Sequence, residues 1–407
     1  MKLGSPATGK DFWGRERELT AIWQCLEKEH LVLPGVRRLG KSSVLLRMQE
    51  QASEHGVVAK VLDVSTLQSA ETFVQHLDVE FAAQGIAAFV KKHHKKVTQW
   101  FSKLDSVALM LPDEWGGAGA EIKLKAPAPA TWQASAKTLQ QRLQTQPLLI
   151  LLDEFPVMLQ NLLKTAPHEA EQVLVWLRTW RQTRDNRCRF VFTGSIGLQN
   201  LLERHGLAVH MNDCYPYQLG PFSGAEAAAM WQQFAVQHHG GLSSPPTVTA
   251  HALQRIGWLA PFYVCLVLDE SCKAARVRID ETAHTFPSAA PNGLTTDDVD
   301  AAYEVLLTQR SRFQHWEQRL REALSKTEFA FVQALLTHLA KNKNGLTLKQ
   351  LSNRLMTQQA DASRRTEQIQ NALAYLTDEG YTTPVNAEGR VQFRSFLLRD
   401  WWGRNHV

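Results

Sequence analysis

The residues best suited to chemistry lie near the N-terminus, in a segment that matches G-x-x-x-x-G-K-[ST] without a mismatch. It runs from Gly35 to Ser42, after the apolar run His30–Leu33 and before a helical stretch. The glycines let backbone N–H groups surround phosphate oxygens, and the helix N-terminus adds positive potential. Lys41 is then placed to reach the β- and γ-phosphates of a nucleotide, and the Ser42 hydroxyl to hold Mg²⁺. The alternative is a chance glycine turn, which the strand-loop-helix context disfavours.

Two carboxylates follow a second apolar run, Pro147–Leu152. They are Asp153 and Glu154. An acidic pair at the end of a buried strand is costly unless it meets a cation or hydrogen-bond donors. We therefore expect Asp153 to bind Mg²⁺ through water and Glu154 to polarise the attacking water. Two solvated carboxylates in a strand-end loop are the alternative, and the phosphate loop makes it the weaker one.

A third apolar run, Arg189–Thr193, also ends in small polar residues, with Ser195 shortly after it. A hydroxyl at such a strand end can contact the γ-phosphate or the lytic water. Thr193 and Ser195 are therefore catalytic candidates. An ordinary strand-to-loop turn remains the alternative interpretation.

These motifs must be positioned by an α/β fold. Four apolar runs predict strands, and helical patterns lie between them; the runs are His30–Leu33, Val57–Val64, Pro147–Leu152 and Arg189–Thr193. Such runs without polar alternation are typical of strands buried on both faces of a parallel sheet. We expect this base domain to span residues 1–220, with an insert at about 66–140.

The rest of the chain predicts two further domains. Residues 221–310 are mostly helical, beginning with a capping box at Ser223 and Glu226, and Glu281–Gly293 has the prolines of a linker. Residues 311–407 predict three helices and then a β-hairpin, the outline of a winged helix; the predicted elements are Phe329–Ala340, Leu348–Met356, Ala362–Glu379, Tyr381–Val385 and Arg390–Leu397.

Several motifs together resemble STAND and initiator-type AAA+ ATPases of the archaeal kind. The matching segments are Phe12–Leu19 (the entry motif hhGRxxEL), Gly35–Ser42 (the GxRRxGKTS variant of the phosphate loop), Asp153–Pro156, Phe192–Gly197, Gly257–Pro261 and Phe393–Trp402. The resemblance implies a P-loop NTPase with an AAA+-type αβα base, a helical lid and a C-terminal winged helix. It also implies ATP or ADP and Mg²⁺ as cofactors, and ATP hydrolysis.

The resemblance assigns further residues to the nucleotide. Gly14, Arg15 and Glu16 would lie near the adenine, and Pro261 would let the lid touch the nucleotide. The whole loop and the first helical turn would bind the phosphates, which adds Val36, Arg37, Arg38, Leu39, Gly40 and Ser43. No lid arginine stands at the family's usual position, which is consistent with slow hydrolysis and a switch.

Two basic clusters give weaker signals. Arg184 and Arg187 are candidates for an arginine finger that reaches a neighbour's nucleotide, with a solvated basic helix face as the favoured alternative. The run Lys91–Lys96 suits an acidic partner or nucleic acid, with a solvated helix face as the favoured alternative. Val107–Lys125 predicts a hairpin within the insert.

The winged helix is the main indication of a macromolecular partner. From residue 341 to 407 there are ten Lys and Arg against six Asp and Glu, a net charge of +4 out of +5 for all 407 residues. Candidate contacts with duplex DNA are Arg364, Arg365, Gln368, Arg390 and Arg394. The alternative is a module that binds a partner protein.

The composition limits the class of protein. Apolar residues make up 44% and charged residues 21%, which excludes collagen-like, disordered and coiled-coil chains. Five scattered cysteines favour a reducing cytoplasm over a disulfide or zinc scaffold, and no apolar run is long enough to span a membrane.

Three functions are compatible with these motifs. They are a STAND-type signalling or defence switch with nucleotide-dependent homo-oligomers, a DNA-associated AAA+ ATPase, and a non-hydrolysing scaffold.

Overall fold

The structure is a computed structural model, and it describes residues 3–104, 131–194, 197–285 and 293–406. The chain forms two compact units. Unit 1 comprises residues 1–14, 35–40 and 220–407, and unit 2 comprises residues 15–34 and 41–219. No helix among the described residues is long and apolar enough to cross a membrane. The hairpin predicted at Val107–Lys125 lies outside the described residues.

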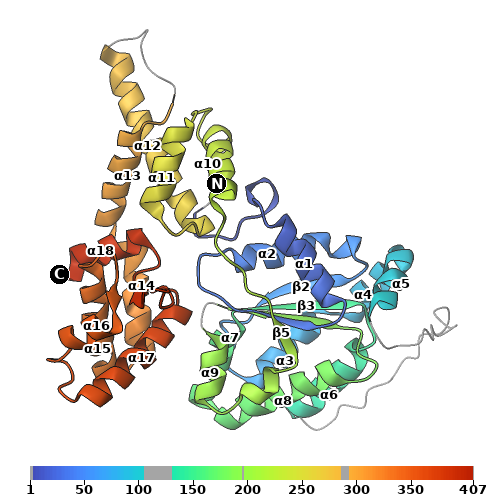
Figure 1. Ribbon diagram of the computed structural model, residues 1–407. Helices are drawn as coiled ribbons and strands as arrows, with labels where there is room; N and C mark the ends of the chain where they lie inside the picture. The colour runs from blue at the N-terminus through green and yellow to red at the C-terminus, as the bar shows by residue number, and fades with distance from the viewer. Residues whose placement is uncertain (1–2, 105–130, 195–196, 286–292, 407) are drawn as a thin grey trace. The chain divides into compact units, whose positions relative to one another are not determined.

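Unit 2 is built on a five-stranded parallel sheet with the strand order β2-β3-β4-β1-β5 (Figure 1). Its strands are β1 (His30–Leu33), β2 (Val58–Asp63), β3 (Leu148–Asp153), β4 (Arg189–Thr193) and β5 (Cys214–Pro216). The register sets Asp63 opposite Asp153 and Leu33 opposite Thr193, so the carboxyl ends share one edge. The four predicted strands are confirmed, and β5 is an additional strand at the edge beside β1.

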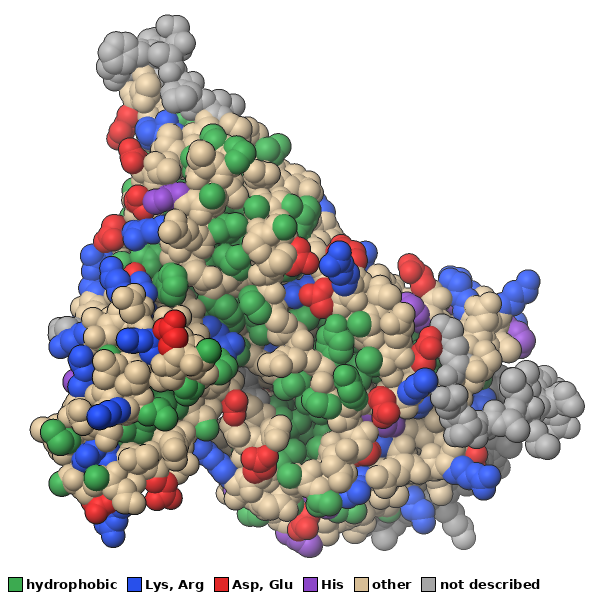
Figure 2. Space-filling model, viewed as in Figure 1, with side chains coloured by type: hydrophobic (Ala, Val, Ile, Leu, Met, Phe, Trp, Pro, Cys, Tyr) green, Lys and Arg blue, Asp and Glu red, His purple; other side chains and the backbone are tan. Residues whose placement is uncertain are grey.

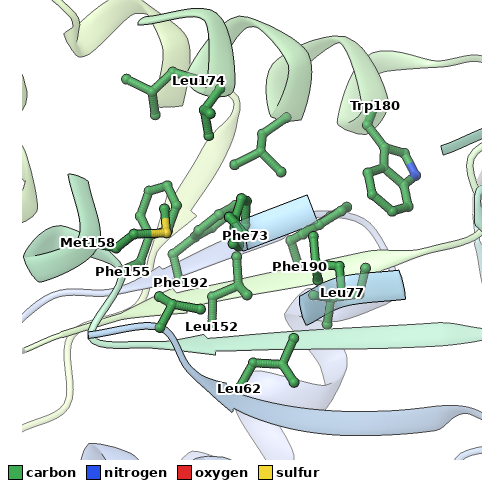
Figure 3. Packing of buried hydrophobic residues seen from close by; sticks show 14 of the residues in the cluster. Leu62, Phe73, Leu77, Leu152, Phe155, Met158, Leu174, Trp180, Phe190 and Phe192 are labelled. Carbon is green, nitrogen blue, oxygen red and sulfur yellow. The ribbon is translucent and has the colours of Figure 1, made fainter. Parts of the chain in front are cut away.

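Helices cover this sheet and fix the ends of its strands. They are α1 (Glu16–Leu26), α2 (Lys41–Gln51), α3 (Ala70–Glu80), α4 (Ala83–Lys92), α5 (His94–Lys103), α6 (Trp132–Leu143), α7 (Phe155–Thr165), α8 (Pro167–Gln182) and α9 (Leu198–Arg204). Figure 3 shows the core between α8 and the sheet, where Phe190 and Phe192 of β4 stack with centroids 5.8 Å apart. Phe155 packs edge-on against Phe192 at 5.0 Å, which anchors the start of α7 directly after β3.

The first helices of unit 1 follow the sheet in sequence. They are α10 (Gly224–His238), α11 (Pro246–Ile256), α12 (Pro261–Thr285) and α13 (Thr296–Thr308). The capping box of Ser223 and Glu226 is confirmed at the start of α10. The linker predicted from Glu281 is wrong at its beginning, because α12 continues to Thr285. The hydroxyl of Thr282 donates to the carbonyl of Arg278 at 2.7 Å, within the last turns of this helix.

Among the described residues, the C-terminal part of unit 1 has five helices and a short antiparallel pair of strands. Its elements are α14 (Arg310–Ala323), α15 (Lys326–Ala340), β6 (Leu346–Thr347), α16 (Leu348–Arg354), α17 (Ala362–Asp378), β7 (Arg390–Val391) and α18 (Phe396–His406). Figure 2 shows Lys and Arg side chains spread over these helices with acidic side chains between them.

Two predicted strands in this region are wrong. Tyr381–Val385 forms only a single β-bridge, between Thr382 and Phe393, and the other strand is wrong in its second half. The segment Arg390–Leu397 was expected to be a strand, but β7 is followed by α18, which begins at Phe396. Its buried residues Leu397, Leu398, Trp401 and Trp402 repeat at helical spacing. The hydroxyl of Ser395 accepts from the backbone N–H of Leu398 at 3.2 Å and so caps the helix.

Candidate functional site

The loop between β1 and α2 has the backbone that a phosphate loop requires. Gly35 has φ 130°, Arg38 φ 76° and Gly40 φ 86°. Among the described residues, only Arg15, Arg38 and Glu154 have positive φ without being glycine, and each lies in a motif singled out from the sequence. Such conformations cost energy and cluster where function needs them.

Asp153 and Ser42 meet at the carboxyl edge of the sheet in unit 2. Asp153 is buried, and burial raises the pKa of its carboxyl, while a hydrogen bond with Ser42 opposes that rise. The negative charges of Glu154 and Asp63 add to the cost of ionising it. A buried carboxylate beside a hydroxyl supplies oxygen ligands of the kind that Mg²⁺ prefers.

No group of three or more His, Cys, Asp or Glu side chains in the described part of the chain is arranged to hold a metal ion by itself. Mg²⁺ commonly takes one or two protein ligands and completes its shell with water and phosphate oxygens. The donors of Ser42 and Asp153 fit that pattern. Lys41, also buried, and Ser43 belong to the first turn of the same helix, α2.

Glu154 is held in a left-handed conformation at the start of α7. Its φ is 56°, and its N–H donates to Asp153 Oδ1 at 3.0 Å. Gly194, directly after β4, packs against Pro156 so closely that a Cβ there would overlap the proline ring. A residue larger than glycine at 194 would therefore displace the turn that carries Glu154. Gly194 was missed from the sequence, where only its place after the strand hints at it.

The two hydroxyl candidates differ in what the structure shows of them. Thr193 is buried, and its hydroxyl donates to the carbonyl of Leu33 at 3.2 Å. Its single proton therefore ties the end of β4 to the end of β1, directly before the phosphate loop. Ser195 lies outside the described residues.

The residues expected near the adenine are consecutive, and the boundary between the two compact units lies between Gly14 and Arg15. In unit 2, Arg15 has φ 75° at the start of α1, and its buried guanidinium donates to Glu18 at 2.6 Å. Glu16 is exposed in the first turn of that helix. In unit 1, Gly14 has φ 62°, and a Cβ there would lie 3.3 Å from the ring of Phe222.

Pro261 begins α12, and the residue after it contacts the phosphate loop within unit 1. The guanidinium of Arg38 lies 3.8 Å from the ring centroid of Phe262. Its Nη2 is also 3.4 Å from Nε2 of His315 on α14. Neither partner was predictable from the sequence, because more than 200 residues separate each of them from the loop.

The candidate arginine fingers are placed differently. Arg187 stacks on the ring of Phe101 at 4.3 Å, whereas Arg184 is exposed. The basic run at residues 91–96 joins α4 to α5, and its four lysines are exposed.

The winged-helix candidates divide into exposed and engaged side chains. Arg364 and Gln368 are exposed on α17. The expectation that Arg365 is displayed there is wrong: it is buried, and its guanidinium donates to Ser352 Oγ at 3.0 Å and to the carbonyl of Gln359 at 2.6 Å.

Two further arginines of this group are also engaged. Arg394 donates to the carbonyls of Thr382 and Thr377, at 3.2 and 3.4 Å. Arg390 donates to the carbonyl of Gly345 at 3.2 Å. These guanidiniums hold the hairpin region together within unit 1.

Comparison with known proteins identifies the fold. No family model and no curated protein sequence matches the chain. A solved Walker-type ATPase of Pyrococcus abyssi matches with a TM-score of 0.58 and 14% identity, over 98% of this chain and 98% of that one. The ORC2 protein of Aeropyrum pernix, in ADPNP and ADP complexes, matches with a TM-score of 0.56 and 15% identity, over 98% of this chain and 94% of that one.

Proposed function

Because the chain has the AAA+ P-loop ATPase fold over nearly its whole length, we propose that it is an Mg²⁺-dependent ATPase acting as a slow nucleotide-driven switch. The observation that carries this proposal is the buried Asp153 carboxylate hydrogen-bonded to Ser42, at the start of the helix that follows a complete phosphate loop. A buried carboxyl whose ionisation is opposed by burial has no structural benefit at this position, whereas it suits a site that a cation enters.

The chain's own residues then have distinct roles. Lys41 and the loop N–H groups bind the phosphates, and Ser42 and Asp153 hold Mg²⁺, which neutralises phosphate charge when bound. Glu154, beside Asp153, orients the water for in-line attack on the γ-phosphate. Thr193 positions the loop through its bond with Leu33.

The engaged arginines of the C-terminal helices favour a protein, and not duplex DNA, as the partner of the proposed switch. Arg365 and Arg394 are engaged inside unit 1, which removes two of the arginines that a DNA-reading surface would use. A STAND-type signalling or defence role, with assembly governed by ATP or ADP, therefore fits better than duplex binding.

Substituting Lys41 with Ala tests the central proposal. ATP turnover by the variant should fall to background, because the ammonium that neutralises the β- and γ-phosphates is lost. Lys137→Ala, which removes an exposed lysine from α6, is the matched control and should turn over ATP at the wild-type rate. The measurement is phosphate release under saturating Mg²⁺ and ATP. Unchanged hydrolysis by Lys41→Ala would refute the proposed ATPase function.

A further inference from the structure

The helices α4 and α5 of unit 2 carry a concentrated positive charge for which ATP hydrolysis has no use. Residues 81–104 hold five Lys and no Asp or Glu. The other residues of unit 2 hold 17 Lys and Arg against 21 Asp and Glu, a net charge of −4. Four of the five lysines, Lys91, Lys92, Lys95 and Lys96, form what we call the lysine cluster. It is a local positive surface on a unit that is otherwise negative.

The four ammonium groups of the lysine cluster are available to a partner. All four side chains are exposed. None of them forms a hydrogen bond or an ion pair through its side chain within the part of the chain that the structure describes. Figure 2 shows Lys and Arg side chains protruding where Figure 1 labels α4 and α5.

The folding of the helices does not account for two of these lysines. Lys91 and Lys92 lie in the last turn of α4, where the negative end of the helix dipole favours cations. Lys95 and Lys96 lie in the first turn of α5, which contains no acidic residue, and there the dipole opposes a positive charge. Charges placed against the preference of their own helix indicate a role in binding.

The helix that bears Lys95 and Lys96 is anchored on unit 2. Trp100 of α5 is buried and packs edge-on against Trp23 of α1, with ring centroids 6.3 Å apart. Gly56 has φ 76°, and a Cβ there would overlap the carbonyl oxygen of Lys96, so backbone meets backbone at the base of the cluster. The lysines therefore stand on a preformed surface, which reduces the entropy lost when a partner binds.

The extent and composition of the cluster indicate the chemistry of its partner. A long polyanion such as duplex DNA would extend over the negative remainder of unit 2. A single strand would stack its bases on exposed Phe, Tyr or Trp rings, and the described residues of α4 and α5 offer none, since Phe89 and Phe101 are partly buried and Trp100 is buried. A short run of Asp or Glu complements four ammonium groups without either cost.

We propose that the lysine cluster binds an acidic peptide segment of a partner protein. The carboxylates of the segment pair with the ammonium groups of both helices. Those that reach the first turn of α5 also complement its dipole, which the lysines oppose. The inference concerns unit 2 alone and does not depend on ATP hydrolysis.

Reversing the charge of two lysines tests the proposal. The probe is a fluorescently labelled octaglutamate peptide, and its binding to the full chain is measured by fluorescence anisotropy without nucleotide. Lys95→Glu combined with Lys96→Glu should weaken binding by about tenfold or more at low salt, because two attractions become repulsions. The difference should shrink as salt is added. The variant should melt no lower than the wild type, because acidic side chains suit a helix N-terminus.

A matched control separates the cluster from net charge. Lys137→Glu combined with Lys164→Glu makes the same change in charge at exposed positions of α6 and α7, and should bind the peptide within about twofold of the wild type. A wild-type protein that does not bind the peptide, or equal weakening by both double variants, would overturn the proposal.

Two further measurements complete the test. Duplex DNA that binds more tightly than the peptide, and that loses this affinity in the Lys95 and Lys96 double variant, would make nucleic acid the partner and overturn the proposal. ATP hydrolysis by the same variant should proceed at the wild-type rate. Failure of the proposed ATPase function would instead appear as a wild-type protein without turnover, whatever its affinity for the peptide.

Discussion

At the scale of single residues, the site is assembled from groups that are unfavourable for folding. Glu154 and Arg38 occupy left-handed backbone that favours glycine, and Asp153 is a carboxylate whose ionisation burial opposes. Each is tolerated because the surrounding sheet and helices hold it in place. We infer that these groups lower the stability of the folded protein because they serve binding. A substitution of Asp153 tests this.

Replacing Asp153 with Asn should stabilise the nucleotide-free protein. Because the pKa of Asp153 is raised in the folded state, its ionised form costs stability, and that cost grows as pH rises from about 3.9 through the folded pKa. The neutral amide removes this cost, so the free energy of unfolding at pH 7 should rise by about 0.5–2 kcal/mol while Mg²⁺-dependent turnover is lost.

Denaturant unfolding without Mg²⁺ or nucleotide measures this effect. The control is Asp185→Asn, at an exposed position after α8 and away from the site, where the change in stability should be close to zero. A less stable Asp153→Asn variant, or one that still hydrolyses ATP, would contradict the argument.

At the scale of elements, a buried polar network joins the amino-terminal ends of three strands of the sheet. Arg181 of α8 has a fully buried side chain, and its guanidinium donates to both oxygens of Asp213, at 2.8 and 2.9 Å. His30 accepts from the N–H of Phe190 through Nδ1, so its Nε2 proton is directed to the carbonyl of Arg181. Burial lowers the pKa of His30 to about 3, and it stays neutral. The network joins α8 to β1, β4 and the start of β5.

Asp213→Asn should cost about 3 kcal/mol of unfolding free energy at pH 7, because it leaves a buried guanidinium without its counter-charge. Burial opposes the ionisation of Asp213, but the hydrogen bonds and charge of Arg181 outweigh it, so its pKa lies below the ordinary value. A lowered carboxylate pKa stabilises the fold above about pH 3.9, and the contribution is lost as pH falls through the folded pKa.

The difference in stability between wild type and Asp213→Asn should therefore be constant near neutral pH and shrink in acid. Urea unfolding across pH measures it. Asp185→Asn, at an exposed position after α8, serves as the control and should show neither effect. A difference that grows in acid would disprove the role given to this pair.

The same elements show how far sequence reasoning reaches. The four longer strands and the phosphate loop were predictable because apolar runs and glycine spacing are local signals. β5 was missed because it has only three residues, one of them a proline, and Phe396–His406 was partly misread because two β-like residues begin it. The partners of Arg38 could not be predicted, because contacts between distant segments leave no pattern in either segment.

At the scale of the whole molecule, helices α10 to α13 and the C-terminal helices α14 to α18 belong to one compact unit, unit 1. Gly257 ends α11 with φ 72°, and a Cβ there would overlap the ring of Phe396 at the start of α18. Arg394 lies 5.7 Å from the ring of Trp258, and Tyr303 of α13 donates to Asp400 of α18 at 2.9 Å. The two regions should therefore move and unfold together.

Gly257→Ala should destabilise both regions at once. The left-handed backbone costs a non-glycine residue about 1–2 kcal/mol, and the overlap with Phe396 adds about 1–3 kcal/mol. Hydrogen exchange should accelerate in α18 as well as in α11. Gly241→Ala is the matched control, since its φ is 79° but a Cβ there meets nothing within 4 Å, and it should accelerate exchange only locally. Exchange confined to α11 in the Gly257 variant would argue for independent regions.

The division of the chain also has a consequence for synthesis on the ribosome. Residues 35–40 are made early, as are residues 1–14 of the same unit, but the remainder of that unit extends from residue 220 to residue 407. At roughly 5–20 residues per second, the loop waits on the order of tens of seconds for Phe262 and His315 to emerge. A nascent chain thus exposes a finished sheet of unit 2 and an unsupported phosphate loop, and the loop's packing becomes a late step of maturation.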